Sequence, residues 1–272
     1  SETVDKTFFV YGGTKSPESK YLLCMIGEYD HSSGLISKPL VVCDKMGVDD
    51  PHDNPSILID DQGYIWVFVS GRGRVRMGFK YKSKKPFRID GFEKITTQEM
   101  TYPQPKKMGS NFFNFFTKYT GVRQLYIEKS KNGIQWSDNQ LLAAIPEKKN
   151  EKSGHYQISS QYQEKKIGTF FNRHPNGIVD RRTDLYYIES SDLGETWNTA
   201  DKQSISIPVT EKNSPSRVED YASLKKNIYL KDMVFDSKGR PICLYIRSNG
   251  HKPGPLSQPY EWCITKWNGS KC

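Results

Sequence analysis

Short apolar runs alternate with turn sequences along the whole chain, and no stretch shows the periodicity of an amphipathic helix. Turns such as Asp61-Gln62-Gly63 and Ser237-Lys238-Gly239 contain a glycine that accepts a positive φ without steric cost. The pattern therefore predicts a string of β-hairpins. We expect strands at residues 21–29, 40–43, 57–60, 64–70, 77–81, 112–116, 125–128, 167–171, 185–189, 228–235 and 242–247.

Two hairpin sequences each occur twice. Residues 56–71 align with residues 232–247 as strand, tight turn and strand, and residues 125–136 align with residues 185–197, both copies ending in Trp. In the second pair, Ser and Asp or Asn side chains are expected to bond the turn backbone while the Trp covers the apolar face. Repeats of this kind indicate a radial or stacked architecture, and this one is a fold staple rather than a catalytic site.

The sequence Ser190-x-Asp192-x-Gly194-x-Thr196-Trp197 resembles the Asp box of sialidase-type BNR repeat β-propellers. The copy at residues 130–136 is one residue shorter, has Asn132 in place of Asp, and resembles a degenerate box. The resemblance implies an all-β fold, a β-propeller of four-stranded antiparallel blades forming a single domain over residues 1–272. Either five blades close the ring, or the chain ends lie inside a larger propeller of up to seven blades.

Composition and net charge indicate what kind of protein this is and which partners it could bind. The 272 residues are 35% hydrophobic and 26% charged, as in an ordinary soluble globular protein, and no apolar run approaches the roughly 18 residues of a membrane helix. The net charge of +9 favours an anionic partner: nucleic acid, a membrane surface or an acidic polysaccharide. No nucleic-acid-binding module is recognisable, so we expect no nucleic acid partner and no membrane span.

The five cysteines are too few and too scattered for a disulfide scaffold, and none forms a CxxC pair. Cys24 with Cys43, and Cys243 with Cys263, lie about one hairpin apart, which leaves disulfides and buried free thiols both open. The fifth is Cys272.

Polar segments stand near predicted strand ends, where a propeller gathers its functional residues. They are residues 49–55, 70–74, 154–157, 171–175 and 247–255, and they contain His52, His155, His174 and His251. The histidine spacing does not fit zinc, so we expect no metal and no cofactor. Arg72, Arg74 and Arg76 alternate, as on a basic strand face. A glycine on each side of Arg72 would also open space for a ligand.

Together these segments resemble the branch of BNR repeat proteins that includes ulvan-lyase-like polysaccharide-degrading propellers. The matching sequences are His52-Asp53-Asn54-Pro55, Ser70-Gly71-Arg72-Gly73, Arg173-His174-Pro175 and Arg182-Thr183-Asp184-Leu185-Tyr186-Tyr187. The resemblance implies a secreted, periplasmic or cell-surface protein, expected to be a monomer, that cleaves an acidic polysaccharide by β-elimination.

Such a lyase must neutralise the enolate that forms when a proton is abstracted next to a uronate carboxylate. By resemblance, His52 and Arg173 lie at the carboxylate, Tyr156 is both base and acid, and His174 or Arg72 gives support. The family pattern leads us to expect a His where Arg72 stands, which is a departure. The residues expected to bind substrate are Arg72, Asn54, His155, His251 and Arg247.

Two other functions stay open. A sialidase-like exo-glycoside hydrolase would need three arginines and a Tyr/Glu nucleophile pair, and its usual first-blade Arg-Ile-Pro segment is absent. A noncatalytic glycan-binding propeller would hold the sugar chain on aromatic side chains such as Trp66, Tyr102, Phe112 and Tyr162.

Overall fold

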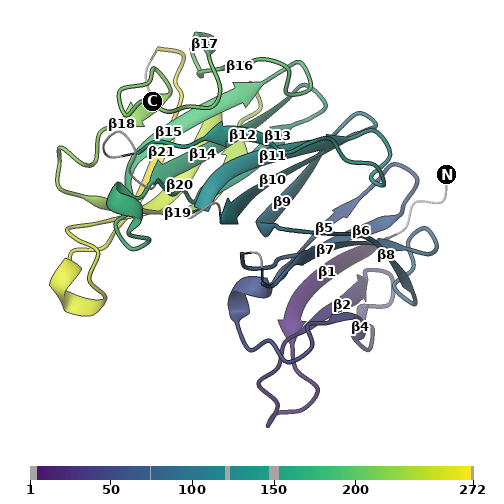
Figure 1. Cartoon of the computed structure of the whole chain (residues 1–272). Coiled ribbons are helices and arrows are strands. Elements are labelled where there is room, and N and C mark those ends of the chain that lie inside the picture. Colours follow the sequence, from purple (N-terminus) through teal and green to yellow (C-terminus); the bar gives the residue numbers. More distant parts are fainter. Residues whose placement is uncertain (1–4, 74, 120–122, 147–152, 271–272) are drawn as a thin grey trace. The chain divides into compact units, whose positions relative to one another are not determined.

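A computed structural model describes residues 5–73, 75–119, 123–146 and 153–270 (Figure 1). In these ranges the regular secondary structure is almost wholly β-strand, with three one-turn 3-10 helices at Pro51–Asp53, Pro175–Gly177 and Gly254–Ser257. Every strand predicted from the apolar runs is present, which confirms the all-β class. Residues 1–105 and residues 106–272 form two compact units. The single domain expected from the sequence stays a prediction.

The first unit contains two four-stranded antiparallel sheets. In one, β2 (Leu23–Asp30) pairs with β1 (Lys6–Gly13), β3 (Leu35–Ile36) and β4 (Leu40–Asp44). The other follows chain order: β5 (Pro55–Ile59), β6 (Ile65–Val69), β7 (Gly78–Ser83) and β8 (Phe92–Gln98). All five residues of β6 are buried, so its continuous apolar sequence forms the centre of the core.

The strand β9 (Thr101–Met108) spans the boundary and is followed by β10 (Asn111–Tyr119), β11 (Arg123–Ser130) and β12 (Gln140–Ala143), which makes a third four-stranded sheet. The fourth sheet is β13 (Gln157–Tyr162), β14 (Lys166–Arg173) and β15 (Thr183–Ser190), extended by the short β16 (Trp197–Asn198), β17 (Ser204–Ile205) and β18 (Arg217–Glu219). The fifth is β19 (Asn227–Phe235), β20 (Pro241–Ser248) and β21 (Glu261–Lys266). Sheets of this antiparallel meander type are the blades of a propeller.

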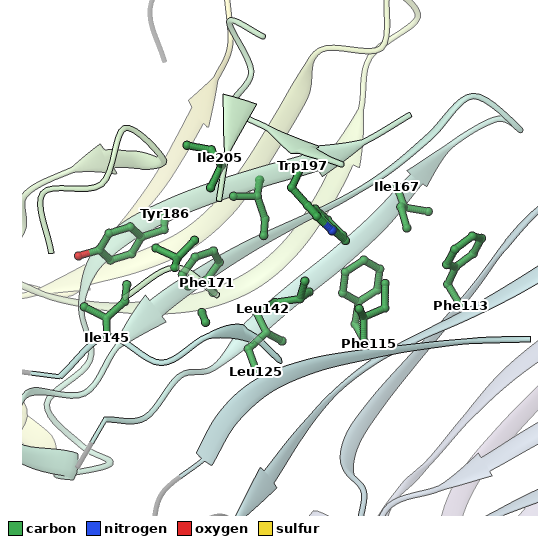
Figure 2. Close-up of a cluster of buried hydrophobic side chains, with 14 of the residues drawn as sticks. Phe113, Phe115, Leu125, Leu142, Ile145, Ile167, Phe171, Tyr186, Trp197 and Ile205 are labelled. Atoms are coloured by element: carbon green, nitrogen blue, oxygen red, sulfur yellow. The ribbon is translucent and has the colours of Figure 1, made fainter. Parts of the chain in front are cut away.

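Aromatic rings dominate the core of the second unit. Figure 2 shows Trp197 beside Phe115 and Phe171 beside Tyr186, with aliphatic side chains around them. The Trp197 and Phe115 ring centroids are 6.1 Å apart in an edge-to-face arrangement, and those of Phe171 and Tyr186 are 5.2 Å apart and stacked. The Asp-box Trp is thus a core residue.

Both copies of the Asp-box turn fold as their side chains predict. In the full box the Asp192 carboxylate accepts from the backbone N–H of Thr196 at 2.9 Å, and Ser190 Oγ accepts from Gly194 N at 2.9 Å. In the degenerate box Asn132 Oδ1 accepts from two backbone N–H groups, those of Ile134 and Gln135. The interpretation of the repeat as a staple is confirmed.

The four cysteines in the described ranges are free thiols. Cys24 and Cys43 face each other across β2 and β4, and burial raises the pKa of the Cys24 thiol. The structure therefore bears out the free-thiol alternative for these four. Cys272 and Arg74 lie outside the described residues.

Candidate functional site

The second unit gathers four polar side chains, Tyr156, His174, Arg123 and Arg182, which we call the Tyr156 cluster. Two hydrogen bonds near the end of the β13–β14 pairing position Tyr156 and His174. The N–H of Tyr156 donates to Asn172 Oδ1 at 3.0 Å, and the N–H of His174 donates to the carbonyl of Gly154 at 2.8 Å. The Tyr156 and His174 rings are therefore held 4.8 Å apart between their centroids.

Two guanidinium groups lie against Tyr156. Arg123 donates to the Tyr156 hydroxyl, with its Cζ 4.8 Å from the ring centroid. Arg182 Cζ is 4.4 Å from the same centroid and 5.1 Å from that of Tyr229. Arg123 is buried, whereas the Arg182 side chain keeps 27% of its surface exposed and can meet a ligand. Positive charge beside a phenol stabilises its ionised form.

His174 is the buried polar group without a partner in this cluster. It is 1% exposed, and neither ring nitrogen has a hydrogen-bond partner within the described part of the chain. Burial, followed by the charges of His155, Arg182 and Arg123, holds its pKa well below the ordinary value, so the ring is neutral at pH 7. A Cβ on Gly154 would lie 2.8 Å from His174 Nδ1, so only glycine leaves room for the ring.

His155 is engaged differently from its neighbour. It is fully buried, its Nδ1 lies 2.7 Å from the carbonyl oxygen of Asn172, and its Nε2 accepts from the N–H of Ile145 at 3.2 Å. Burial lowers its pKa to about 4, against a weaker opposing effect of the Asn172 bond. Both ring nitrogens are bonded to backbone groups, one just after β12 and one in β14, so His155 links two sheets and has no nitrogen left for a substrate.

Arg173 also lies beneath the surface. Its Nε is 2.5 Å from Asp184 Oδ2, with the two side chains 4% and 1% exposed. Asp184 has a positive φ of 58° and accepts from the N–H of Ala222 at 2.8 Å through its other oxygen. The charge of Arg173 is therefore already compensated, whereas Arg182, which lies 3.9 Å from Asp180 Oδ1, keeps 27% of its side chain exposed.

In the first unit, the Asp50 carboxylate is hydrogen-bonded to Arg72, Arg76 and His52, and we call these four residues the Asp50 cluster. Asp50 Oδ2 accepts from Arg72 and from Arg76, each at 2.7 Å, and Oδ1 accepts from the ring Nδ1 of His52. Burial acts to raise the pKa of Asp50, but hydrogen bonds from Arg76, His52 and Arg72 outweigh it and hold the pKa far below its usual range. The carboxylate thus fixes the proton of His52 on Nδ1 and leaves Nε2 for a ligand.

A buried ion pair supports the Asp50 cluster. Asp53 is fully buried and lies 3.1 Å from Lys45 Nζ and 2.9 Å from an Arg76 guanidinium nitrogen. The backbone N–H of Arg72 also donates to the carbonyl oxygen of Arg76 at 2.7 Å. Arg72 therefore takes part in an ordered ionic network, with 42% of its side chain exposed.

The remaining predicted residues lie in three different places. Asn54 lines a pocket with His52 in the first unit. His251 lines a groove with Tyr229, which also contacts Arg182. Arg247 in β20 forms an ion pair with Glu261 in β21 at 2.9 Å. The charge of Arg247 is therefore neutralised within the sheet.

Sequence reasoning missed Arg123 and Asp50 as site residues, and it quoted Arg182 only as part of a motif. Arg123 joins Tyr156 from a different blade, and no local pattern marks it. Asp50 did carry a signal, because an Asp two residues before a His can bond both its backbone and its ring.

Among the described residues, no helix is both long and apolar enough to cross a membrane. Repeated antiparallel meanders with an Asp-box turn define the class of the fold, the β-propeller. Over residues 24–271 the sequence matches the BNR repeat-containing family. The chain belongs to this family.

Comparison with known proteins finds similarity to an ulvan lyase and, in the fold, to a sialidase. The chain is 22% identical to an ulvan lyase of Pseudoalteromonas sp. (strain PLSV), covering 97% of this chain and 60% of that protein. It therefore spans less than two thirds of that relative's length. A solved ulvan lyase structure bound to -[GlcA(1-4)Rha3S]- superposes with a TM-score of 0.83 at 19% identity, covering 99% of this chain and 68% of the other. Trypanosoma rangeli sialidase gives a TM-score of 0.53 at 11% identity, covering 97% of this chain and 43% of the other. The two structural likenesses show the propeller fold.

Proposed function

We propose that this protein is a polysaccharide lyase that cleaves an acidic polysaccharide by β-elimination. The observation that carries the proposal is the Tyr156 cluster: a tyrosine hydroxyl bonded to one guanidinium, a second guanidinium over its ring, and a neutral histidine beside it. A phenol stabilised in its ionised form can act as a base near neutral pH. The similarity to an ulvan lyase, a protein that acts on an acidic polymer, supports the same class of reaction.

In the proposed step, the Tyr156 phenolate removes the proton α to the uronate carboxylate. The C–H electrons form the new carbon–carbon double bond, the bond to the glycosidic oxygen breaks, and Tyr156 returns the proton to that oxygen. The products are an unsaturated uronide and a new sugar hydroxyl, so no water is consumed. Negative charge develops on the carboxylate during the step, and cations placed there lower its energy.

We assign the carboxylate of the sugar to Arg182, with neutral His174 as hydrogen-bond partner to the substrate. The partly exposed Arg182 side chain and the two unpartnered nitrogens of buried His174 support this assignment. Arg173, which is buried and paired with Asp184, holds the end of β14 in position. Arg182 thus takes the role that the resemblance gives to Arg173.

His52, Asn54 and Arg72 are proposed to bind the polymer from the first unit. The Asp50 carboxylate orients His52, and the exposed part of Arg72 supplies positive charge. The expectation that His251 binds substrate is kept, because its groove shares Tyr229 with the Tyr156 cluster. A polymer substrate of this kind fits a secreted, periplasmic or cell-surface protein, and we retain that proposal together with a monomeric state.

The direct test is to incubate the protein with ulvan, pectic and glycosaminoglycan polymers while following ultraviolet absorbance for an unsaturated uronide, with a fluorogenic sialoside alongside. We expect absorbance to rise on an acidic polymer and Tyr156→Phe to abolish the rise while polymer binding persists. Full activity of Tyr156→Phe would remove Tyr156 from the mechanism. Sialoside release without absorbance would move the protein to the hydrolases, and silence in both assays would leave a glycan-binding role.

A further inference from the structure

The two copies of the Asp-box turn place their tryptophans differently. Trp197, which closes the full box, is 1% exposed and lies in the core. The copy at residues 130–136 has one residue fewer between its Ser and its Trp. Since side chains alternate in direction along an extended chain, one residue fewer redirects the ring. Trp136 is only partly buried, and it is held by a hydrogen bond from its Nε1 to the carbonyl oxygen of Gly133 at 2.7 Å and by an edge-to-face contact with Phe112.

Trp136 lines a surface pocket of about 460 Å³ in the second unit. The degenerate box contributes Gln135 and Trp136 to the lining, and the full box contributes Leu193 and Glu195. The two hairpins are linked by an ion pair between Lys129 Nζ and Glu195 Oε1 at 2.6 Å. Volumes of this size are usual for small-ligand sites, so the pocket between the two turns has room for one sugar ring.

The lining of this pocket has the chemistry of a sugar-binding site. Trp136 supplies aromatic surface, which suits the apolar face of a sugar ring, and Gln135 supplies an amide group that donates to and accepts from hydroxyls. Lys131 adds an exposed ammonium group. Lys129 is paired with Glu195, whereas Lys131 forms no ion pair with another described residue, so its charge is left for an acidic group.

The pocket and the Tyr156 cluster lie at opposite ends of one strand. β11 begins at Arg123, which bonds the Tyr156 hydroxyl, and ends at Ser130, which lines the pocket. At about 3.3 Å per residue, the two ends of this eight-residue strand are about 23 Å apart. A sugar ring in the pocket therefore does not occupy the place where the proposed cleavage occurs.

We propose that this pocket, which we call the Trp136 pocket, is a second sugar-binding site that holds one residue of an acidic polysaccharide. Trp136 contacts the sugar ring, and Lys131 pairs with its acidic group. The polysaccharide class rests on the proposed function, while the pocket stands on the geometry of the two box turns. Two separate sites on one protein strengthen binding to a long chain, because occupation of one site holds the polymer near the other.

The test measures the retardation of each variant in native gels that contain ulvan, together with its thermal midpoint. Trp136→Ala is expected to weaken retention by about tenfold, the usual scale for one aromatic contact, and Trp136→Phe by less than about threefold because an aromatic surface remains. Ile134→Ala, at an exposed apolar residue of the same turn outside the pocket lining, should keep parental retention. Unchanged retention of a folded Trp136→Ala variant would overturn the inference.

A pair of lysine variants gives a second test that does not disturb the packing of the indole. Lys131→Ala should weaken retention by about three- to fivefold. Lys238→Ala removes the same charge from an exposed turn residue outside the pocket and should keep parental retention. Equal retention of the two variants would overturn the inference. In gels with desulfated ulvan, a Lys131→Ala effect that persists assigns the carboxylate and one that disappears assigns the sulfate ester; both results uphold the pocket.

The same measurements separate this inference from the lyase proposal. Weakened retention of Trp136→Ala and Lys131→Ala, with no unsaturated product from the parent protein, would uphold the pocket and reject the lyase. Where product forms, the defect of Trp136→Ala should appear as a higher KM on the polymer, and a defect in kcat alone would overturn the pocket as a site separate from cleavage. Absence of retention of the parent protein by ulvan would also overturn it.

Discussion

Arg182 and Arg123 contact the same tyrosine but differ in what they can reach. Arg123 is buried against Tyr156 and Tyr119, so it acts on substrate only through the tyrosine. Arg182 stays partly exposed between the rings of Tyr156 and Tyr229. In the proposed mechanism, Arg123 is therefore a positioning residue and Arg182 is the residue that meets the carboxylate.

Replacing Arg182 with Ala is expected to lower kcat/KM on the acidic polymer by about 10²- to 10³-fold, the usual cost of removing one group that stabilises developing charge. Arg182→Lys should recover only part of the loss, because an ammonium lacks the planar fork that pairs with a carboxylate. Steady-state kinetics checks this. Arg181→Ala, on the same exposed loop, is the control and should keep parental values. Equal effects of the two alanine variants would contradict the role of Arg182.

His155 predicts a pH dependence of stability. Its pKa is lowered to about 4 in the folded state, so between that value and the ordinary pKa near 6.5 the unfolded chain binds a proton that the folded chain does not. Stability from this group is therefore present above about pH 6.5 and is lost as pH falls. From pH 7.5 to pH 5 we expect its contribution to the free energy of unfolding to drop by about 2 kcal/mol.

Urea unfolding at the two pH values measures this drop, and His155→Gln should show a smaller one. His174, whose pKa is also lowered by burial, contributes in the same direction and remains in that variant. A parent protein equally stable at pH 5 and pH 7.5 would show that these imidazoles are not held neutral by burial.

At the scale of elements, the strands and their turns could be predicted because their signals are local. The repeated hairpins share one device: Asp60 accepts from the N–H of Tyr64, and Asp236 accepts from the N–H of Arg240, each with a glycine at positive φ between them. Strands such as β1 and β8 were missed because mixed polar and apolar exposure blurs their alternation. The contact between Arg123 and Tyr156 could not be predicted, because the two residues belong to segments of different sheets that meet only in the fold.

The Asp box predicts a measurable cost at the element scale. Asp192 accepts backbone and hydroxyl bonds from Thr196 and a hydroxyl bond from Ser190, which together hold its pKa at about 2 against the effect of burial. Asp192→Ala is expected to lower the free energy of unfolding by about 1 to 3 kcal/mol. Urea unfolding measures this, with exposed Asp138→Ala as the control expected to stay within about 0.5 kcal/mol of the parent. A neutral Asp192→Ala would reject the turn as a staple.

At the scale of the whole molecule, the net charge of +9 suits an anionic ligand. In the sequence, the net charge and the motif resemblance agree on an acidic partner, and this partner stays a prediction. The proposed mechanism depends on the side chains that surround Tyr156. Their contacts come from the packing of different blades, which no single segment of the sequence encodes.

In the proposed reaction, the glycosidic bond breaks by elimination. This is tested by running the reaction in water enriched with heavy oxygen, followed by mass spectrometry of the oligosaccharide products. Because elimination consumes no water, we expect products free of the label and one unsaturated end for each cleavage. Heavy oxygen in the new reducing ends beyond that seen in an intact oligosaccharide incubated alongside would mean hydrolysis and would contradict it.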